Sequence, residues 1–324
     1  MEQILTIAIP TFNRPGQIQT QVRLLLPQLN EGVCLVVYDN CSQNPVKELF
    51  TEKELSQFSI IRNRMNVGAD ANIARCFENC STPWLWTLSD DDYAKSNAVE
   101  IVLTEINNNF EAVFLCFWSD RYFKTIGFEE LAYEFRSARV FTISFAMSFC
   151  TYNMSKLQNS LQDYYVNLSS MVGTIVLVLK YVQRNSQAVC IFTDKIPIST
   201  YDSEVGWNYA VFICRSRLFI EAFDGENNRQ YNQTLFLGYH KTNYSLVLLN
   251  RSGSKLSYRR RWRAYRQIIQ NQGFFNALRY TPKHMIYVFL YLIMQHKWLQ
   301  LIVIVKRKIF GQKINQSSER IRKA

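Results

Sequence analysis

The 324-residue sequence has little glycine, little proline and no internal repeat. Its 11 glycines and 7 prolines are too few for a collagen-like or low-complexity chain. No stretch resembles another at a period of about 20 to 50 residues, which argues against a solenoid. Hydrophobic residues make up 48% of the chain, enough to bury a core in one large or two modest domains, so extensive disorder is excluded.

Paired cysteines, clustered histidines and an export signal are also missing. The eight cysteines form no Cys-x-x-Cys pair, and most lie in apolar runs such as VFLCFW, so we expect free, reduced thiols. His240, His284 and His296 have no partner at metal-ligand spacing, so a zinc site is not expected. The N-terminus lacks a basic stretch followed by a long apolar run, which predicts a cytoplasmic protein.

Acidic residues are almost absent from the C-terminal part of the chain. Residues 251–324 contain 17 Lys and Arg but one acid, Glu319, for a net charge of +16, whereas residues 1–250 carry −5. A segment this basic suggests an anionic partner, either a membrane surface or nucleic acid.

The apolar stretch within this basic region is short for a membrane span. Residues 285–294 are apolar throughout, but polar residues at 295–297 interrupt the run, and a spanning helix needs about 20 mostly apolar residues. Basic residues flank the stretch at 259–263 and 306–308. We therefore expect a peripheral or monotopic segment near 284–308 on the anionic, cytoplasmic face of the cell membrane, with a buried helix and solvated basic tail as the alternative.

The first 120 residues alternate short apolar runs with amphipathic segments. This alternation is typical of an α/β fold with a mostly parallel, Rossmann-like sheet and helices on both faces. The expected strands are residues 5–10, 33–39, 58–63, 84–90 and 112–118, and the expected helices are residues 16–29, 46–55, 68–80 and 96–109. Such a sheet binds ligands at the carboxyl ends of its strands.

The pattern is less regular from residue 120 to residue 215. Residues 141–150 resemble a strand, 171–185 a buried helix, and 188–201 a strand or hairpin. From about residue 216 the pattern is helical. We therefore predict a catalytic domain over residues 1–215 and a helical C-terminal region over residues 216–324.

Three consecutive carboxylates follow the apolar run WLWTL. Asp90, Asp91 and Asp92 repel one another unless a cation neutralises them or solvent screens them. Oxygen ligands select Mg²⁺ or Mn²⁺, which keep positions open for substrate phosphates. A solvated acidic turn is the alternative, but the position after a buried strand favours a metal site.

Polar residues also follow the first three expected strands. Asp39 and Asn40 end the second strand, where such groups can accept hydrogen bonds from a base or ribose, although Asp-Asn is also a common turn pair. Residues 10–14 follow the first strand, and Asn66 and Gly68 follow the third. Glycine permits close backbone approach, and the next helix offers free N–H groups to an anion.

The ordered set of these motifs resembles glycosyltransferase family two, whose members have the GT-A fold. The matching pieces are IAIPTFNRP, VVYDN, RNRMNVGADANIARC and LSDDD, within about residues 4–110. The donor-binding residues implied by the resemblance are Pro10, Thr11, Asn13, Arg14, Asp39, Asn66, Gly68, Asn72, Asp90 and Asp91. Asp39 would recognise the base, and Asp92 and Asp90 would ligate a Mn²⁺ or Mg²⁺ ion at the donor diphosphate.

The general base is not identified by the resemblance. Family members invert the anomeric centre by direct displacement, which requires a base for the acceptor hydroxyl. Many relatives carry a Glu-Asp pair where this chain reads NLSSMVGTIVLVLK, without an acid. Asp163 is the first candidate, followed by Asp202 and Glu204, and an ordinary surface acid is the alternative for each.

The expected function is therefore inverting, metal-dependent sugar transfer from a nucleotide-diphosphate donor. A looser resemblance of FTISFAMSFCTYNMSKL and YDSEVGWN to O-antigen and capsule glycosyltransferases implies a saccharide acceptor in bacterial surface polysaccharide synthesis. The basic C-terminal region suits a polyprenyl-diphosphate-linked acceptor at the inner membrane surface.

Three other functions are compatible with parts of the sequence. A sugar-phosphate nucleotidyltransferase shares the sheet but opens with a glycine-rich loop, and this chain has no glycine before Gly16. A non-enzymatic nucleic-acid-binding protein would use RRRWRAYR but leaves the aspartates unexplained, so no nucleic acid is expected. A catalytically inactive membrane scaffold is the last alternative.

Overall fold

The computed structural model describes residues 3–199, 215 and 217–223. All of them belong to the first of two compact units, Met1–Arg260 and Arg261–Ala324. Of the predicted C-terminal region, only helix α11 (Arg217–Phe223) is described, and the predicted membrane-surface segment near 284–308 lies outside the described residues. Within the described ranges, no helix combines the length and the apolar character needed to cross a bilayer.

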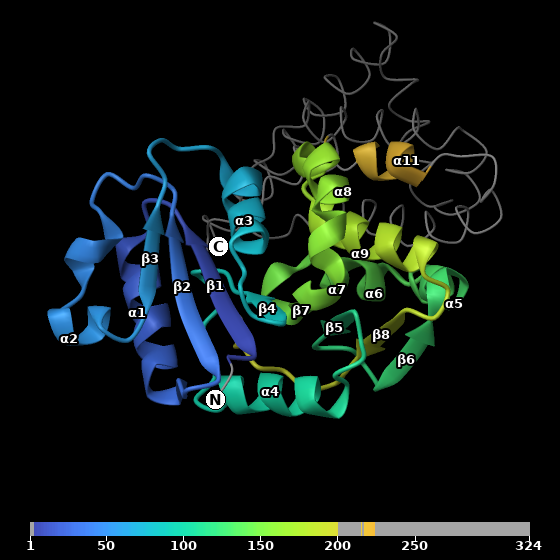
Figure 1. The fold of residues 1–324 in the computed structure, drawn as a ribbon, viewed down its shortest axis with the longest axis horizontal. Helices are drawn as coiled ribbons and strands as arrows, with labels where there is room; N and C mark the ends of the chain where they lie inside the picture. The colour runs from blue at the N-terminus through green and yellow to red at the C-terminus, as the bar shows by residue number, and fades with distance from the viewer. Residues whose placement is uncertain (1–2, 200–214, 216, 224–324) are drawn as a thin grey trace, which may run out of the picture. The chain divides into compact units, whose positions relative to one another are not determined.

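A mixed sheet of eight strands forms the centre of the fold (Figure 1). The strands are β1 (Leu5–Thr11), β2 (Val33–Asp39), β3 (Ser59–Arg62), β4 (Trp84–Thr87), β5 (Phe114–Cys116), β6 (Phe123–Ile126), β7 (Cys150–Asn153) and β8 (Val189–Phe192). They lie in the order β3-β2-β1-β4-β7-β5-β8-β6, and β6 and β7 run opposite to the rest. The prediction of a mostly parallel α/β sheet is confirmed.

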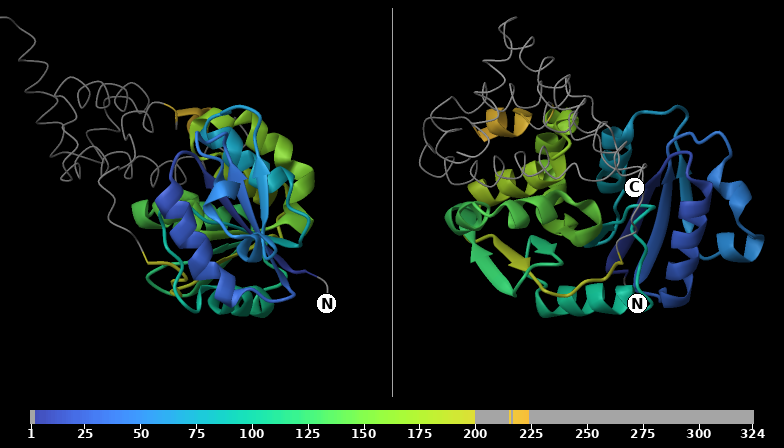
Figure 2. Two further views of the ribbon diagram at one scale, coloured as in Figure 1. Left: turned by 90° about the vertical axis from the view of Figure 1, so that its left-hand side faces the viewer. Right: turned by 180° about the vertical axis from the view of Figure 1, so that it is seen from behind.

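Helices cover both faces of this sheet (Figures 1 and 2). The helices are α1 (Pro15–Leu25), α2 (Glu52–Leu55), α3 (Ala69–Glu78), α4 (Ala98–Asn108), α5 (Gly127–Glu134), α6 (Ala138–Phe145), α7 (Met154–Leu157), α8 (Leu161–Val166) and α9 (Gly173–Arg184). Short 3₁₀ segments are η1 (Leu26–Gln28), η2 (Val46–Leu49), η3 (Met147–Phe149), η4 (Gln158–Ser160) and η5 (Leu168–Ser170).

Apolar side chains from alternate strand positions form the core on each face. On one face, Ile7 and Ile9 of β1 share a buried cluster with residues of α1 and α4. On the other face, Phe77 of α3 makes edge contacts with Tyr152 of β7 and Tyr164 of α8, at centroid distances of 4.8 and 5.2 Å. Burial on both faces explains why β1, β2 and β4 appear in the sequence as short, nearly continuous apolar runs.

The prediction of a strand at residues 141–150 is wrong. Residues 138–145 form α6, which begins after Ser137, whose side chain accepts a hydrogen bond from the backbone N–H of Val140. The strand β7 begins only at Cys150, after η3. In the helix, the buried side chains of Phe141 and Phe145 lie on one face because they are four residues apart. The same stretch alternates apolar and polar residues, which is also the pattern of a strand, so the sequence pattern did not distinguish the two.

Candidate functional site

The carboxyl ends of β1, β2 and β4 meet at one edge of the sheet. Thr11 ends β1 in register with Asp39, which ends β2, and Pro10 pairs with Tyr38 one position earlier. The chain after β4 forms a loop at residues 89–94, here called the acidic loop, which contains the three aspartates. The predicted ligand residues after these strands are therefore brought to one edge.

Left-handed backbone conformations also gather at this edge. Asn13, Cys41 and Gly68 have φ angles of 53°, 64° and 85° and follow β1, β2 and β3. Trp118, with φ of 71°, follows β5. Such conformations are unfavourable for residues other than glycine and persist where surrounding contacts hold them, often at binding sites.

Asp90 and Asp91 share one guanidinium group. Asp90, which is 4% exposed, accepts a hydrogen bond from Oγ1 of Thr11 at 2.6 Å and one from Nη1 of Arg14 at 2.9 Å. The same Arg14 nitrogen lies 2.7 Å from Oδ2 of Asp91. Burial lowers the pKa of Arg14, but the two carboxylates outweigh it and the pKa is raised. These contacts tie the end of β1 to the acidic loop.

Asp92 has no such cationic partner among the described residues. Its Oδ2 accepts a hydrogen bond from Oγ of Ser148 at 2.7 Å. Burial raises the pKa of Asp92 more than the hydrogen bond from Ser148 lowers it, and the negative charge of Asp91 raises the pKa further. Asp92 is thus a partly buried carboxylate whose negative charge no neighbouring side chain of the described residues balances.

The donor set at the acidic loop fits a metal at Asp92 better than at Asp90. Both Asp90 oxygens already accept one hydrogen bond each from protein groups, whereas Oδ1 of Asp92 has no donor among the described residues; ligation by Asp90 stays a prediction. No group of three or more His, Cys, Asp or Glu side chains in the described ranges is arranged to hold a metal. A Mg²⁺ or Mn²⁺ ion at Asp92 would therefore share its coordination with substrate phosphates, as such ions usually do.

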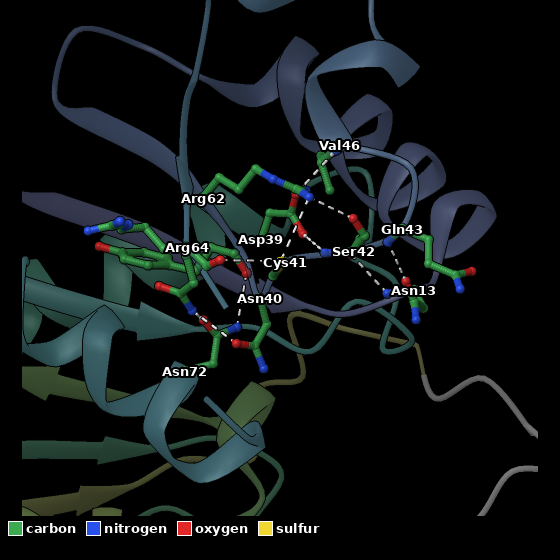
Figure 3. A network of polar contacts seen from close by, with 12 residues as sticks. Asn13, Asp39, Asn40, Cys41, Ser42, Gln43, Val46, Arg62, Arg64 and Asn72 are labelled. Carbon is green, nitrogen blue, oxygen red and sulfur yellow. Dashed lines mark hydrogen bonds and ion pairs between the residues drawn. The ribbon is translucent and has the colours of Figure 1, made fainter. Parts of the chain in front are cut away.

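Asp39 holds the loop after β2 in shape (Figure 3). Its Oδ1 accepts a hydrogen bond from the N–H of Ser42 at 2.8 Å, and its Oδ2 accepts one from the N–H of Val46 at 3.3 Å and pairs with Nη1 of Arg62. Burial raises the pKa of Asp39, but these bonds outweigh it and the pKa is lowered. The carboxylate is covered by Arg62 and has no exposed surface, which does not support the predicted direct contact with a base.

Asparagine side chains hold the segment between β3 and α3. Asn40 donates to Oδ1 of Asn66 at 2.9 Å and accepts from Nδ2 of Asn63 at 3.0 Å. Asn63 also donates to Oδ1 of Asn72 at 2.8 Å, so it bridges Asn40 and Asn72. Gly68, whose N–H donates to Asn66, directly precedes α3. The predicted residues Asn66, Gly68 and Asn72 therefore belong to one network that positions the start of α3.

A cavity of about 240 Å³ opens between the loops after β1 and β2. Its lining residues are Thr11, Asn13, Arg14, Pro15, Ile18, Ser42, Gln43, Asn44, Val46 and Leu49. Asn13 joins the two loops, because its N–H donates to Oγ of Ser42 at 2.9 Å and its Oδ1 accepts from the N–H of Gln43 at 2.8 Å (Figure 3). A mixed polar and apolar pocket of this kind suits an organic ligand with hydrogen-bonding groups.

Comparison with known proteins identifies the family. Residues 6–171, just over half of the chain, match the family described as Glycosyl transferase family 2. The chain belongs to this family. A curated relative is an "Uncharacterized glycosyltransferase" of Haemophilus influenzae, 28% identical over 107 residues. That match covers 33% of this chain and 35% of the relative, so the chain spans about a third of the relative's length.

Solved structures share the GT-A-like fold of this family 2 chain. Residues 1–349 of S. aureus TarS superpose with a TM-score of 0.58 at 13% identity, over 83% of this chain and 81% of that one. The same part of TarS in complex with UDP-GlcNAc gives a TM-score of 0.55 at 12% identity, again over 83% and 81%. At these identities the likeness establishes the α/β fold alone.

The structure places Asp163 away from the acidic loop of this family 2 site. Asp163 lies on α8 and makes a two-pronged ion pair with Arg184, at 2.7 and 2.8 Å. Arg184 ends α9 shortly before β8 begins, so the pair lies toward the amino ends of the parallel strands, beside a separate cavity of about 510 Å³. The role of Asp163 as a general base is therefore not supported. Asp202 and Glu204 lie outside the described residues.

Sequence reasoning missed several residues of the candidate site. Ser42 and Gln43 line the cavity, and Asn63 and Arg62 hold the loops around it. Phe12, 40% exposed between Thr11 and Asn13, is a large apolar side chain at the same edge. Only their position in the sequence could have indicated these residues, because each lies within four residues of the end of an expected strand.

Proposed function

We propose that this family 2 chain transfers a sugar from a nucleotide-diphosphate donor to a saccharide acceptor, with inversion and with Mn²⁺ or Mg²⁺. One observation carries the proposal: the cavity beside Thr11 and Arg14 lies at the same edge as Asp92, a carboxylate with no cationic partner among the described residues. A nucleoside needs a pocket of mixed polarity, and its diphosphate needs a cation. Both features occur together here.

The residues of the site divide these tasks. The cavity between the loops after β1 and β2 would hold the nucleoside, with Phe12 beside it. Asp92 would hold the metal with the diphosphate, and a divalent ion there supplies Lewis-acid stabilisation of the leaving phosphates. Asp90 keeps Arg14 and Thr11 in place. The start of α3, after Gly68, offers N–H groups to an anion.

The acceptor and the setting of the reaction extend this proposal. The charge of +16 over residues 251–324 supports an acceptor at an anionic membrane, such as a polyprenyl-diphosphate-linked saccharide in O-antigen or capsule synthesis. The protein would then act at the cytoplasmic face of the membrane. Asp202 and Glu204 are the candidates for the general base. The family match disfavours the nucleotidyltransferase and nucleic-acid-binding alternatives.

The proposal is tested by following donor sugars by proton NMR. The full chain is incubated with UDP-, GDP-, CDP- and dTDP-sugars, Mg²⁺ and a panel of saccharide acceptors, and the anomeric signals of the donor and of the glycoside product are recorded. We expect one donor class to be consumed, with the opposite anomer formed first and no reaction in EDTA. First formation of the retained anomer would contradict inversion, and full activity in EDTA would contradict metal dependence.

A further inference from the structure

The acidic loop is held from two sides by buried polar side chains. One is Gln21 on α1, and the other is Ser148 in η3, and neither has exposed surface. They lie 71 and 56 residues from Asp92 in the sequence, so only the fold brings them to it. Their hydrogen bonds are directed at the loop rather than at their own helices.

Ser148 fixes the side chain of Asp92. Its Oγ accepts a hydrogen bond from the N–H of Ser89 at 2.9 Å and donates to Oδ2 of Asp92 at 2.7 Å. Because a backbone N–H occupies the acceptor side of the hydroxyl, its proton is directed to the carboxylate. The carbonyl of Ser148 accepts from Nε1 of Trp86 at 2.9 Å, which fixes the position of η3 itself.

Gln21 fixes the backbone of the same loop. Its Nε2 donates to the carbonyl of Asp92 at 2.8 Å and to that of Ser89 at 3.3 Å, and its Oε1 accepts from the N–H of Ala94 at 3.0 Å. A buried amide on the apolar face of a helix costs stability unless its donors and acceptor are paired. On α1, Gln21 adjoins buried Val22, and three hydrogen bonds to the acidic loop satisfy the amide.

The two contacts leave one oxygen of Asp92 available. Oδ2 is occupied by Ser148, while Oδ1 has no donor among the described residues. A carboxylate held in one rotamer loses less conformational freedom when it binds an ion than a free carboxylate does. The contacts of Ser148 and Gln21 therefore hold the carboxylate of Asp92 ready to bind an ion.

We propose that Ser148 and Gln21 are positioning residues for the metal-facing carboxylate of Asp92, with Ser148 setting its rotamer and Gln21 setting the backbone beneath it. The inference rests on the proposed function, in which Asp92 faces the ion. Both residues would act through Asp92, because their hydrogen bonds are made to the acidic loop. Loss of partners that orient a metal ligand typically lowers metal affinity about 10- to 100-fold.

The test compares Mn²⁺ affinity between the wild type and Ser148→Ala. Free Mn²⁺ is measured by electron paramagnetic resonance while full-length protein is titrated, in the presence of whichever of UDP, GDP, CDP or dTDP binds the wild type. We expect Ser148→Ala to weaken Mn²⁺ binding about 10- to 100-fold. Gln21→Glu, which keeps the side-chain shape but loses both donors, should also weaken it.

Ser144→Ala is the matched control. Ser144 is also fully buried, but its hydroxyl donates to the carbonyl of Val140 within α6, at 2.7 Å. We expect its Mn²⁺ affinity to equal that of the wild type. If circular dichroism shows that Ser148→Ala does not fold, Ser148→Cys takes its place. Cysteine nearly keeps the volume of serine but is only a weak hydrogen-bond donor.

Two results separate this inference from the proposed function. Wild-type Mn²⁺ affinity in a folded Ser148 variant would overturn the positioning role while leaving the metal site intact. Absence of Mn²⁺-dependent nucleotide binding in the wild type would instead overturn the proposed function, and the positioning role with it.

Discussion

At the scale of single residues, three identical aspartates acquire different roles from their surroundings. Asp90 and Asp91 share the guanidinium of Arg14, whereas Asp92 receives one hydroxyl and no cation among the described residues. A carboxylate paired with arginine supports the shape of a site, and an unbalanced one attracts a cation. The pairing with Arg14, and not the order of the aspartates, therefore singles out Asp92 as the carboxylate that we propose faces an ion.

Replacing Asp92 with asparagine should stabilise the ligand-free protein while removing metal-dependent binding. The pKa of Asp92 is raised, first by burial, so its ionised form costs stability above that pKa, and this cost disappears as the pH falls through it. Asparagine keeps an acceptor for Ser148. We expect a higher Tm than wild type in EDTA at pH 7.5, with a smaller difference at acidic pH.

The control for this effect is Asp91→Asn, which breaks a contact with Arg14 and should not raise the Tm. A Tm below that of the wild type for Asp92→Asn would contradict the description of Asp92 as an unbalanced buried charge.

Replacing Asp39 with asparagine should destabilise the fold. Arg62 would lose its partner, and hydrogen bonds to a charged acceptor contribute about 1.5–3 kcal/mol. Because the pKa of Asp39 is lowered, the stabilisation is present at neutral pH and is lost as the pH falls through that pKa. Urea unfolding at pH 7 should show a loss of about 2 kcal/mol.

The comparison variant for Asp39 is Asp120→Asn, which breaks the exposed pair between Asp120 and Arg139. Exposed pairs contribute little to stability, so the midpoint of unfolding should change far less. Equal losses in the two variants would show that Asp39 is not a buried support.

Local motifs predicted which residues gather at the site, but not how they pair. Thr11, Asn13 and Arg14, which the motif after the first strand singled out, line one cavity, and their contact with a donor stays a prediction. The covering of Asp39 by Arg62 and the role of Ser148 depend on contacts between distant parts of the chain. For Gln21 the sequence contained only a weak indication of its role. It lies next to Val22 on the buried face of an amphipathic helix, where a polar side chain needs a hydrogen-bonding partner.

At the scale of elements, the regular first half of the fold was predictable, as were helix α9 and strand β8 in the second half, whereas α6, β6 and β7 were not. Strands buried on both faces, such as β1 and β4, leave apolar runs with clear boundaries. The antiparallel strands β6 and β7 have four residues each, too few for a period to emerge. In α6, the four-residue spacing of the phenylalanines fits a helix, and their alternation with polar residues fits a strand equally well. Ser137, which caps the helix, was the residue that favoured the helix.

Replacing Gly68 with alanine tests the segment that precedes α3. Gly68 has φ of 85° and ψ of 161°, a conformation nearly confined to glycine in which a side chain costs about 1–3 kcal/mol, although a Cβ would meet no atom within 4 Å. We expect about 1–3 kcal/mol less stability by urea unfolding and weaker binding of the nucleotide in a fluorescence titration.

Gly16→Ala is the control for this substitution, because Gly16 has open space around it and no left-handed backbone. Its nucleotide affinity should match the wild type. An unchanged affinity in Gly68→Ala would remove this segment from the donor site.

At the scale of the whole molecule, net charge distinguishes the C-terminal part of the chain from the rest. The net charge is −5 over residues 1–250 and +16 over residues 251–324, so attraction to anionic lipid would come from the C-terminal part. The family match ends at residue 171, before this part begins. Membrane attachment is therefore a property to test independently of the fold.

Neutralising basic residues near the predicted membrane segment should weaken lipid binding. In the full chain, Lys306→Gln, Arg307→Gln and Lys308→Gln together remove three charges, each worth about 1 kcal/mol near an anionic surface. Sedimentation with phosphatidylglycerol vesicles should fall in the triple variant and, for the wild type, with added salt. Equal sedimentation of variant and wild type would place the membrane contact elsewhere.

The central claim is that Asp92 holds a divalent ion with the diphosphate of a nucleotide donor. The most direct measurement is a thermal-shift titration of UDP, GDP, CDP and dTDP, with and without Mn²⁺, on the wild type and Asp92→Asn. A ligand at 100 times its Kd adds about 2.7 kcal/mol to folded-state stability. We predict a Mn²⁺-dependent rise in Tm with one nucleotide, absent in Asp92→Asn; an equal rise in the variant, or none in the wild type, would contradict the claim.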